Sequence, residues 1–198
     1  VVYNVLIGNR HGRELYNRVF VVSAYSGMTD LLLEHKKSGS PGVFSLFAGA
    51  GNKWAWTEAL SSVAIAMQAR NAEIFDIQAD RDTADNFILE RIEESRNCLI
   101  DLHRLCAYGQ FRLDENLATV REVLSSIGEA HSAFNTALLL RQKGVAATCV
   151  DLTGWRDGRA LTLEERMSEA LDGIDISEEL PIVTGYASCP EGLVRQYG

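Results

Sequence analysis

The sequence predicts an α/β fold built on a mainly parallel sheet. Three short apolar runs alternate with longer helical segments, and this order is typical of the crossover connections that join parallel strands. The three runs are RVFVVSA (18–24), VAATCVDL (145–152) and LPIVTGYAS (180–188). The chain has 198 residues, of which 46% are hydrophobic and 23% charged, so it is long enough and apolar enough for one domain with a core.

The first part of the chain predicts short elements. Val1–Arg10 is expected to be the end of an element that begins outside the sequence, and residues 12–17 form a helical or turn segment. The β-branched run at 18–24 is apolar on both faces, which predicts a central strand of the parallel sheet. A short helix at Met28–Lys36 and a turn at residues 38–42 (SGSPG) follow it.

The middle of the chain is predicted to be mostly helical, because apolar residues recur at helical spacing and caps delimit the segments. The predicted helices are Trp54–Phe75, Thr83–Cys106, a helix from the N-cap Asp114 to near Ser126, and Glu129–Lys143, which stops at Gly144. A polar loop (151–159) and a last helix (161–171) separate the second and third strands. We expect the helical block of residues 54–126 to be an insertion that packs beside the sheet and forms one wall of a cleft.

Composition and charge exclude several kinds of partner. The net charge is −8 and no Lys/Arg cluster could follow a phosphate backbone, so nucleic acid is not expected. No apolar run approaches the ~20 residues that span a membrane, and no signal peptide opens the chain. The four cysteines, Cys98, Cys106, Cys149 and Cys189, have no metal-ligand spacing, which favours reduced thiols, no metal site and a cytoplasmic location.

Small polar residues follow the first predicted strand, in Ser23-Ala24-Tyr25-Ser26-Gly27-Met28-Thr29-Asp30. Ligands of open parallel sheets bind at the carboxyl ends of strands. Gly27 allows a backbone conformation and a close ligand approach that other residues resist, and a helix opened by Thr29 and Asp30 suits an anion at its N-terminus. A plain strand-to-helix turn with Ser/Thr capping explains the same residues.

Two further turns have the same character. Ser125-Ser126-Ile127-Gly128-Glu129 would place a carboxylate at the start of a helix, beside the positive end of its dipole, although acidic residues are also favoured there as caps. Thr184-Gly185-Tyr186 at the end of the last strand would admit a ligand, while Tyr186 could instead pack in the core with its hydroxyl bonded. Each motif is weak alone, and the three in this order are more specific.

In combination, these motifs resemble the signatures of aspartokinases. V-V-S-A-x-x-G-x-T-D-x-L (21–32) is similar to the first signature, S-x-G-E (126–129) to the second, and PIVTGYAS (181–188) to the strand and loop that lead to the third. The likeness extends along nearly the whole chain. The segments VFVVSAYSGMTDLLLEHKKSGSPGVF, FRLDENLATVREVLSSIGEAHSAFNTALLL and VDLTGWRD are most similar to aspartokinases encoded with ectoine-biosynthesis enzymes.

The resemblance implies the amino-acid kinase fold, a three-layer αβα sandwich on a mainly parallel sheet. It also implies a reaction: with ATP and Mg²⁺, the side-chain carboxylate of L-aspartate is phosphorylated to 4-phospho-L-aspartate, the first step of the aspartate-family and ectoine pathways. Matching the motifs, Ser23 and Thr29 would hold aspartate, Glu129 would help to fix it and Tyr186 would border it. The turns around these residues would be shaped by Ala24, Gly27, Ser126, Gly128 and Gly185.

This implied chemistry needs no strong general base. A carboxylate nucleophile with a reference pKa of about 3.9 is already ionised at neutral pH, and phosphoryl transfer depends mostly on positioning and charge stabilisation. The sequence contains no G-x-x-x-x-G-K-[ST], so a P-loop enzyme is excluded.

Two stretches of the family pattern match no position in this sequence. These are the early K-x-G-G-T-S strand, whose lysine neutralises the transferring phosphoryl group, and the late Arg-Gly-x-Ser-Asp/Glu loop, which supplies an arginine and an acidic residue. We therefore expect residues 1–198 to be part of a kinase domain, with the catalytic lysine, the arginine and acid, the nucleotide-binding part and the regulatory ACT domains outside it. We expect these residues alone to be inactive.

Other interpretations stay open. The chain could belong to another amino-acid kinase that acts on glutamate, N-acetylglutamate, carbamate or a nucleotide, although the turns at 23–30 and 126–132 argue against it. It could also bind aspartate or a nucleotide without turnover. The helices of residues 54–126 could form an oligomerisation surface, and a homo-oligomer is compatible with either function.

Overall fold

A computed structural model describes residues 6–49 and 54–190 of the chain. The chain divides into two compact units. Unit 1 comprises Val1–Ser23 and Ser132–Gly198, and unit 2 comprises Ala24–His131. One boundary lies between Ser23 and Ala24, and the other lies between His131 and Ser132, inside a long helix. Each unit contains some of the predicted site residues.

Unit 1 contains a three-stranded sheet in which both strand pairs are parallel. The strands are β1 (Phe20–Val22), β2 (Ala147–Val150) and β3 (Leu180–Thr184), in the order β1-β3-β2. The register pairs Val22 with Thr184 and Val150 with Val183, so the carboxyl ends of all three strands lie at one edge of the sheet. This confirms the predicted α/β class and the parallel pairing.

The predicted position of the first strand is wrong for the sheet formed by the described residues. β3 is the central strand there, and β1 lies at an edge. Val21 is 67% exposed although its register partner Val183 is 6% exposed. A short run of residues that is apolar on both faces therefore does not distinguish an edge strand from a central strand.

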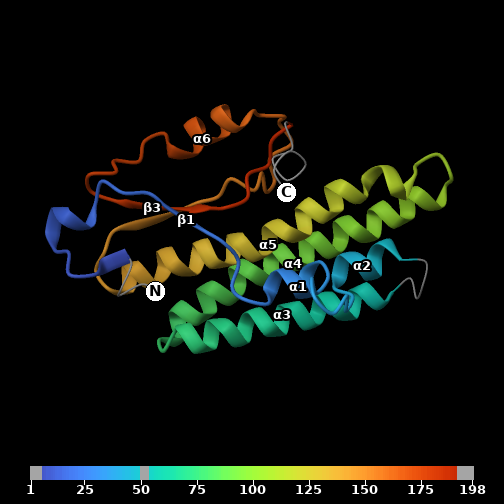
Figure 1. Ribbon diagram of the computed structural model, residues 1–198, viewed down its shortest axis with the longest axis horizontal. Coiled ribbons are helices and arrows are strands. Elements are labelled where there is room, and N and C mark those ends of the chain that lie inside the picture. Colours follow the sequence, from blue (N-terminus) through green and yellow to red (C-terminus); the bar gives the residue numbers. More distant parts are fainter. Residues whose placement is uncertain (1–5, 50–53, 191–198) are drawn as a thin grey trace. The chain divides into compact units, whose positions relative to one another are not determined.

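Helices pack on both faces of this sheet (Figure 1). The C-terminal part of α5 (Leu113–Gln142) contributes Ala133, Ala137 and Leu140 to a cluster with Leu180 and Ile182. On the other face, α6 (Leu163–Leu171) packs its apolar residues against a cluster formed by Val150, Leu152, Val183 and Ala187.

Two helix ends in unit 1 follow directly from the local sequence. A capping box between Thr162 and Glu165 begins α6, because each residue bonds the backbone N–H of the other. Beyond α5, Gly144 has a φ of 75°, and the N–H of Val145 donates to the carbonyl of Leu140, as expected for a C′ glycine. A short 3₁₀ helix, η2 (Gly12–Leu15), precedes β1.

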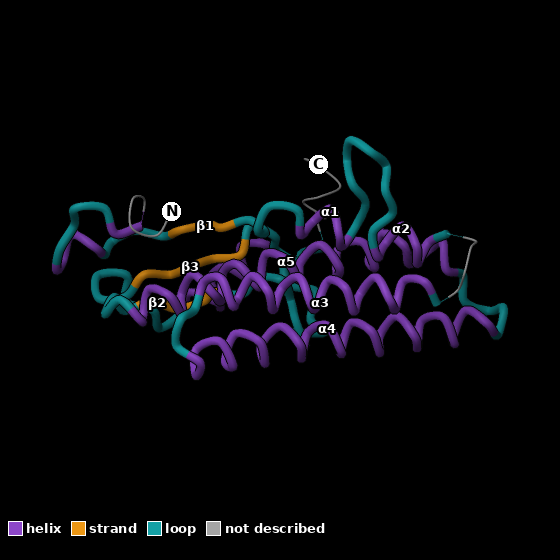
Figure 2. Tube along the Cα trace, turned by 90° about the horizontal axis from the view of Figure 1, so that it is seen from below, coloured by secondary structure: helices purple, strands orange, loops and turns teal. Residues whose placement is uncertain are grey.

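Unit 2 is helical. Its helices are α1 (Met28–Leu32), α2 (Val43–Ala48), α3 (Ala55–Ile74), α4 (Gln78–Ala107) and the first part of α5. Figure 2 shows α3 and α4 side by side along their length, and their buried faces share one core that includes Trp56, Leu60, Ile88, Ile92 and Leu99. On α4, the apolar residues Ile88, Ile92 and Leu99 are buried.

Several predicted helix boundaries differ from the structure. α1 ends at Leu32 instead of Lys36, because Leu33 leaves the helical region and Glu34 forms a bridge with Pro41 across the predicted turn. α2 was not predicted, since its six residues are too few to show a clear helical period. α4 begins five residues before Thr83, in a polar segment without apolar periodicity.

The largest difference is α5, which is one continuous helix where two were predicted. The predicted break at Gly128 does not occur, although glycine inside a helix costs about 1 kcal/mol relative to alanine. Unit 2 contains the helical block of residues 54–126, whose interpretation as an insertion in a kinase domain stays a prediction.

Candidate active site

Ser23 lies directly after β1, at the carboxyl edge of the sheet in unit 1. Pairing between β1 and β3 extends one step past the strands, because the Gly185 N–H donates to the Val22 carbonyl at 3.0 Å. The Ser23 carbonyl accepts a hydrogen bond from Ser132 Oγ at 2.7 Å, and Ser23 is exposed. Ser23 and Gly185 are therefore neighbours at the edge where parallel sheets bind ligands.

Tyr186 follows on the same edge and is half-buried. Its carbonyl accepts a hydrogen bond from Thr184 Oγ1 at 2.9 Å, and that hydroxyl oxygen accepts one from the Leu152 N–H at 3.0 Å. Thr184 is buried, so its hydroxyl joins the ends of β2 and β3 inside the protein. In the Thr184-Gly185-Tyr186 turn, Gly185 is exposed and Tyr186 half-buried.

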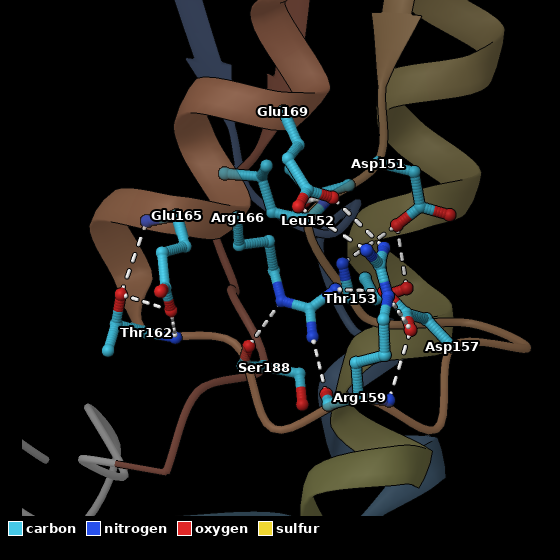
Figure 3. Close-up of polar contacts among 11 residues, drawn as sticks. Asp151, Leu152, Thr153, Asp157, Arg159, Thr162, Glu165, Arg166, Glu169 and Ser188 are labelled. Carbon is cyan, nitrogen blue, oxygen red and sulfur yellow. Dashed lines mark hydrogen bonds and ion pairs between the residues drawn. The ribbon is translucent and has the colours of Figure 1, made fainter.

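A charged network on α6 holds the segment that follows Tyr186 (Figure 3). Arg166 Nε donates to the Ser188 carbonyl at 2.5 Å, and Arg166 Nη1 lies 3.4 Å from Asp157 Oδ2. Asp157 also pairs with Arg159, which in turn pairs with Glu169. Hydrogen bonds from Arg159 are the main reason that the pKa of the Asp157 carboxyl lies below its ordinary value.

The same network fixes the loop between β2 and α6. Gly154 has a φ of 72°, and a Cβ at this position would lie 3.0 Å from Ser188 Cβ, so the loop packs closely on the segment after β3. Asp157, Arg159, Arg166 and Ser188 line a cavity of about 300 Å³. Arg159 and Arg166 pair with the carboxylates of Asp157 and Glu169, and these ion pairs hold the loop in place. These residues were not predicted to have a role; the Thr-x-x-Glu capping pattern that begins α6 is the one local sequence signal there.

In unit 2, the turn between Ala24 and Thr29 leads into α1. Gly27 has a φ of 83° and is the N-cap of α1, so the turn requires the left-handed conformation that glycine adopts freely. Thr29 is half-buried in the first turn of the helix. α1 has five residues, and the Met28 N–H donates to the Tyr25 carbonyl; the anion site expected at this helix N-terminus stays a prediction.

The Ser126–Glu129 segment lies in the middle of α5, so the prediction that Glu129 begins a helix is wrong. Glu129 is half-buried and gains nothing from a helix N-terminus. Gly128 is required for another reason: a Cβ there would lie 2.9 Å from Ala24 Cβ and 3.4 Å from Leu32 Cδ1. Ser126 Oγ donates to the Val123 carbonyl of the same helix. Gly128 thus lets the turn before α1 approach α5 beside Glu129.

A buried hydrogen-bond chain lies next to this approach. His131 Nε2 lies 2.7 Å from Asn71 Oδ1, and Asn71 Nδ2 donates to Asp85 Oδ1 at 2.7 Å. The ring of His131 also packs against the ring of Tyr25, with centroids 5.3 Å apart and an interplanar angle of 75°. Burial, and secondly the charge of Arg70, lower the pKa of His131 to about 4, so the ring is neutral at neutral pH.

The predicted site residues thus fall into two groups. Ser23, Gly185 and Tyr186 lie together in unit 1, at the carboxyl ends of β1 and β3. The other predicted residues lie in unit 2, where the turn before α1 packs on the middle of α5: Ala24, Gly27, Thr29, Ser126, Gly128 and Glu129.

Within residues 6–49 and 54–190, the structure has no group of three or more His, Cys, Asp or Glu side chains arranged to hold a metal ion. In the same ranges, no helix combines the length and the apolar character that crossing a membrane requires.

The described residues form an α/β fold on a parallel sheet, and their polar strand-end turns lie at the edge where open parallel sheets in general bind ligands. No family model matches the chain. The chain is 51% identical over 197 residues to aspartate kinase Ask_Ect of Stutzerimonas stutzeri (strain A1501). The match includes 100% of this chain and 41% of that protein, so the chain spans about two fifths of the length of this curated relative. The resemblance to aspartokinases of the ectoine-associated branch is thereby confirmed.

Proposed function

We propose that the protein containing this chain is an aspartate kinase. It transfers the γ-phosphate of ATP to the side-chain carboxylate of L-aspartate and forms 4-phospho-L-aspartate, the first step of the aspartate-family and ectoine pathways. The observation that supports this most strongly is the 51% identity along the whole chain to a protein named aspartate kinase. The small polar turns of both units, which match the family signatures, agree with it.

In this proposal the described residues bind and orient aspartate. The hydroxyls of Ser23, an exposed residue, and Thr29, a half-buried one, would hold the substrate. Tyr186 would border it. Glu129 would pair with its ammonium group, by charge alone, since it lies in the middle of α5 and not at a helix N-terminus. Orientation of the reacting carboxylate is the main contribution that these groups can make to phosphoryl transfer.

The nucleotide is expected to bring its Mg²⁺ with it. Protein-bound Mg²⁺ keeps several waters and phosphate oxygens and needs one or two carboxylates. In this proposal Mg²⁺ would be held mainly by the phosphates of ATP and would supply charge stabilisation to the transferring group.

We also propose that the sheet and its flanking helices are part of an amino-acid kinase fold with residues 54–126 as an insertion. Helices on both faces of a parallel sheet support this layering. The family's catalytic lysine and arginine match no position in this chain, so the proposed activity concerns the complete encoded protein. Self-association through the helical block also stays a proposal, which light scattering of the complete protein tests.

The test is a coupled ADP-release assay on the complete protein with L-aspartate, L-glutamate and N-acetyl-L-glutamate. We expect turnover with L-aspartate. In Glu129→Gln, KM for aspartate should rise about a hundredfold, because the substrate ammonium loses a charge-assisted hydrogen bond worth up to about 3 kcal/mol. Thr29→Ala should raise KM by about tenfold, since a neutral hydrogen bond is worth about 1 kcal/mol. Glu115→Gln, an exposed change on the same helix, is the matched control.

The other outcomes separate the alternatives. Turnover with glutamate or N-acetylglutamate would assign the protein to another amino-acid kinase activity. Absence of turnover with every acid, together with aspartate binding in calorimetry, would favour a binding protein without catalysis.

A further inference from the structure

The turn before α1 contacts α5 on both sides of Glu129. On one side a Cβ at Gly128 would lie 2.9 Å from Ala24 Cβ, and on the other the ring of His131 packs edge-on against Tyr25. Ala24 and Tyr25 belong to the turn that leads to Thr29. The relative position of Thr29 and Glu129 therefore depends on these two contacts within unit 2.

We propose that His131 is a positioning residue of the aspartate site, which fixes the turn containing Thr29 against the part of α5 that contains Glu129 by holding the ring of Tyr25. This inference rests on the proposed function for the identity of the substrate. His131 itself is fully buried and acts through Tyr25, without touching the substrate.

The orientation of the His131 ring is determined by groups on two other helices. Asn71 on α3 donates its amide hydrogen to the carboxylate of Asp85 on α4, so its amide oxygen must face His131. An oxygen acceptor at 2.7 Å requires that His131 Nε2 is the donor. The neutral ring is therefore held in one tautomer and one orientation by α3 and α4, and this orientation presents it to Tyr25.

Tyr25 is held from a second direction. The guanidinium of Arg70, one residue before Asn71 on α3, lies 5.7 Å from the centroid of the Tyr25 ring, within the range of a cation–π contact. Edge-to-face packing of the two rings adds a directional preference to their burial. A side chain at 131 that fills the space without an aromatic ring would leave the tyrosine able to move.

Two variants separate positioning from stability. His131→Gln keeps an N–H donor for Asn71 Oδ1 but removes the ring that faces Tyr25. His131→Phe keeps a ring for Tyr25 but leaves the Asn71 oxygen without its donor. The proposal predicts that the glutamine variant loses substrate positioning and keeps most of its stability. The phenylalanine variant should lose more stability and keep more of the positioning.

The experiment measures steady-state kinetics, melting temperature and hydrogen exchange for the complete protein. His131→Gln should raise KM for aspartate about tenfold with KM for ATP unchanged, less than the hundredfold that a misplacement of 1 Å can cost. It should also speed exchange of the amides at residues 27–33. His131→Phe should lower the melting temperature and raise KM for aspartate less than His131→Gln does, because a ring still packs against Tyr25 although the bond that orients it is lost. In the Tyr25→Leu background, His131→Gln should add nothing further to KM.

Wild-type KM and wild-type exchange at residues 27–33 in His131→Gln would overturn the positioning role. If the wild-type protein shows no aspartate-dependent ADP release, the proposed function fails, and the exchange measurement alone then decides the inference. A lower melting temperature or slower refolding of His131→Gln, with KM and hydrogen exchange unchanged, would give His131 a purely structural role. That result would also overturn the proposal.

Discussion

The polar networks of the two units hold predicted substrate segments by opposite means. In unit 1 the network around Arg166 is charged, and the side chains of Arg159 and Glu169 are 60% and 52% exposed. In unit 2 the bond between His131 and Asn71 lies in the core, where both residues are fully buried. Exposed ion pairs are screened by water and are individually worth little, whereas breaking a buried hydrogen bond leaves a polar group unsatisfied. Breaking the buried hydrogen bond of unit 2 should therefore cost more stability than breaking an exposed ion pair of unit 1.

The largest effect is expected from Asn71→Ala. This change removes the acceptor of His131 Nε2 and the donor to Asp85, and it leaves a small cavity. We expect a loss of about 3 kcal/mol in the free energy of opening α3, the sum of an unsatisfied buried group and lost packing, measured by hydrogen exchange of the α3 amides. The control is Glu73→Ala, which removes an exposed ion pair with Arg70 on the same helix and should change little. Equal losses in both variants would contradict the comparison.

A somewhat smaller effect is expected from pH. Histidine in the unfolded chain has a pKa near 6.5, whereas burial lowers the pKa of folded His131 to about 4. Between these values the unfolded chain binds a proton that the folded chain does not, so stability is full above about pH 7 and falls as the pH decreases toward 4. From pH 7.5 to pH 5, the expected loss attributable to His131 is about 2 kcal/mol, since one pKa unit corresponds to 1.36 kcal/mol.

Denaturant unfolding at pH 7.5 and at pH 5, monitored by hydrogen exchange of the amides of unit 2, measures this loss of stability. The groups that face His131 are the guanidinium of Arg70 and, through Asn71, the carboxylate of Asp85. Carboxylates such as Glu34, whose pKa is lowered chiefly by its hydrogen bond with Arg121, lose their contribution only at more acidic pH. They are also common to every variant. The difference between wild type and His131→Leu isolates the histidine, and identical pH slopes in the two proteins would show that His131 is not responsible.

The sequence predicted the parallel sheet because its strands and helices alternate, but it did not predict the order of the strands. Val21 is as apolar as Val183, yet only Val183 is covered by α6 in the described sheet. Gly27 and Gly128 show the same limit within the candidate site. The positive φ of Gly27 is a local property that a turn sequence can indicate, whereas Gly128 is required by Ala24, about a hundred residues earlier in the chain.

The buried network was not predicted for a similar reason. His131 and Asn71 are 60 residues apart, and Asn71 and Asp85 are 14 apart. None of these residues forms a motif with its sequence neighbours, so their contact depends entirely on how α3, α4 and α5 pack. The strand-end turns, by contrast, are local motifs, so Ser23, Gly185 and Tyr186 could be proposed as site residues from the sequence alone, and their role stays a prediction.

The smallest effect is expected within the charged network, where two arginines with similar partners should behave differently. Arg166 has a side chain 7% exposed, and its Nε bonds the Ser188 carbonyl, so Arg166→Gln should cost about 1–2 kcal/mol by leaving buried acceptors unsatisfied. Arg159 is bonded to Asp157 and Glu169 at the surface, so Arg159→Gln should give a change near the limit of detection. Thermal unfolding in low and high salt measures both. A large, salt-sensitive loss for Arg159→Gln would show that the exposed charges hold the loop, and the contrast between the two networks would then have to be abandoned.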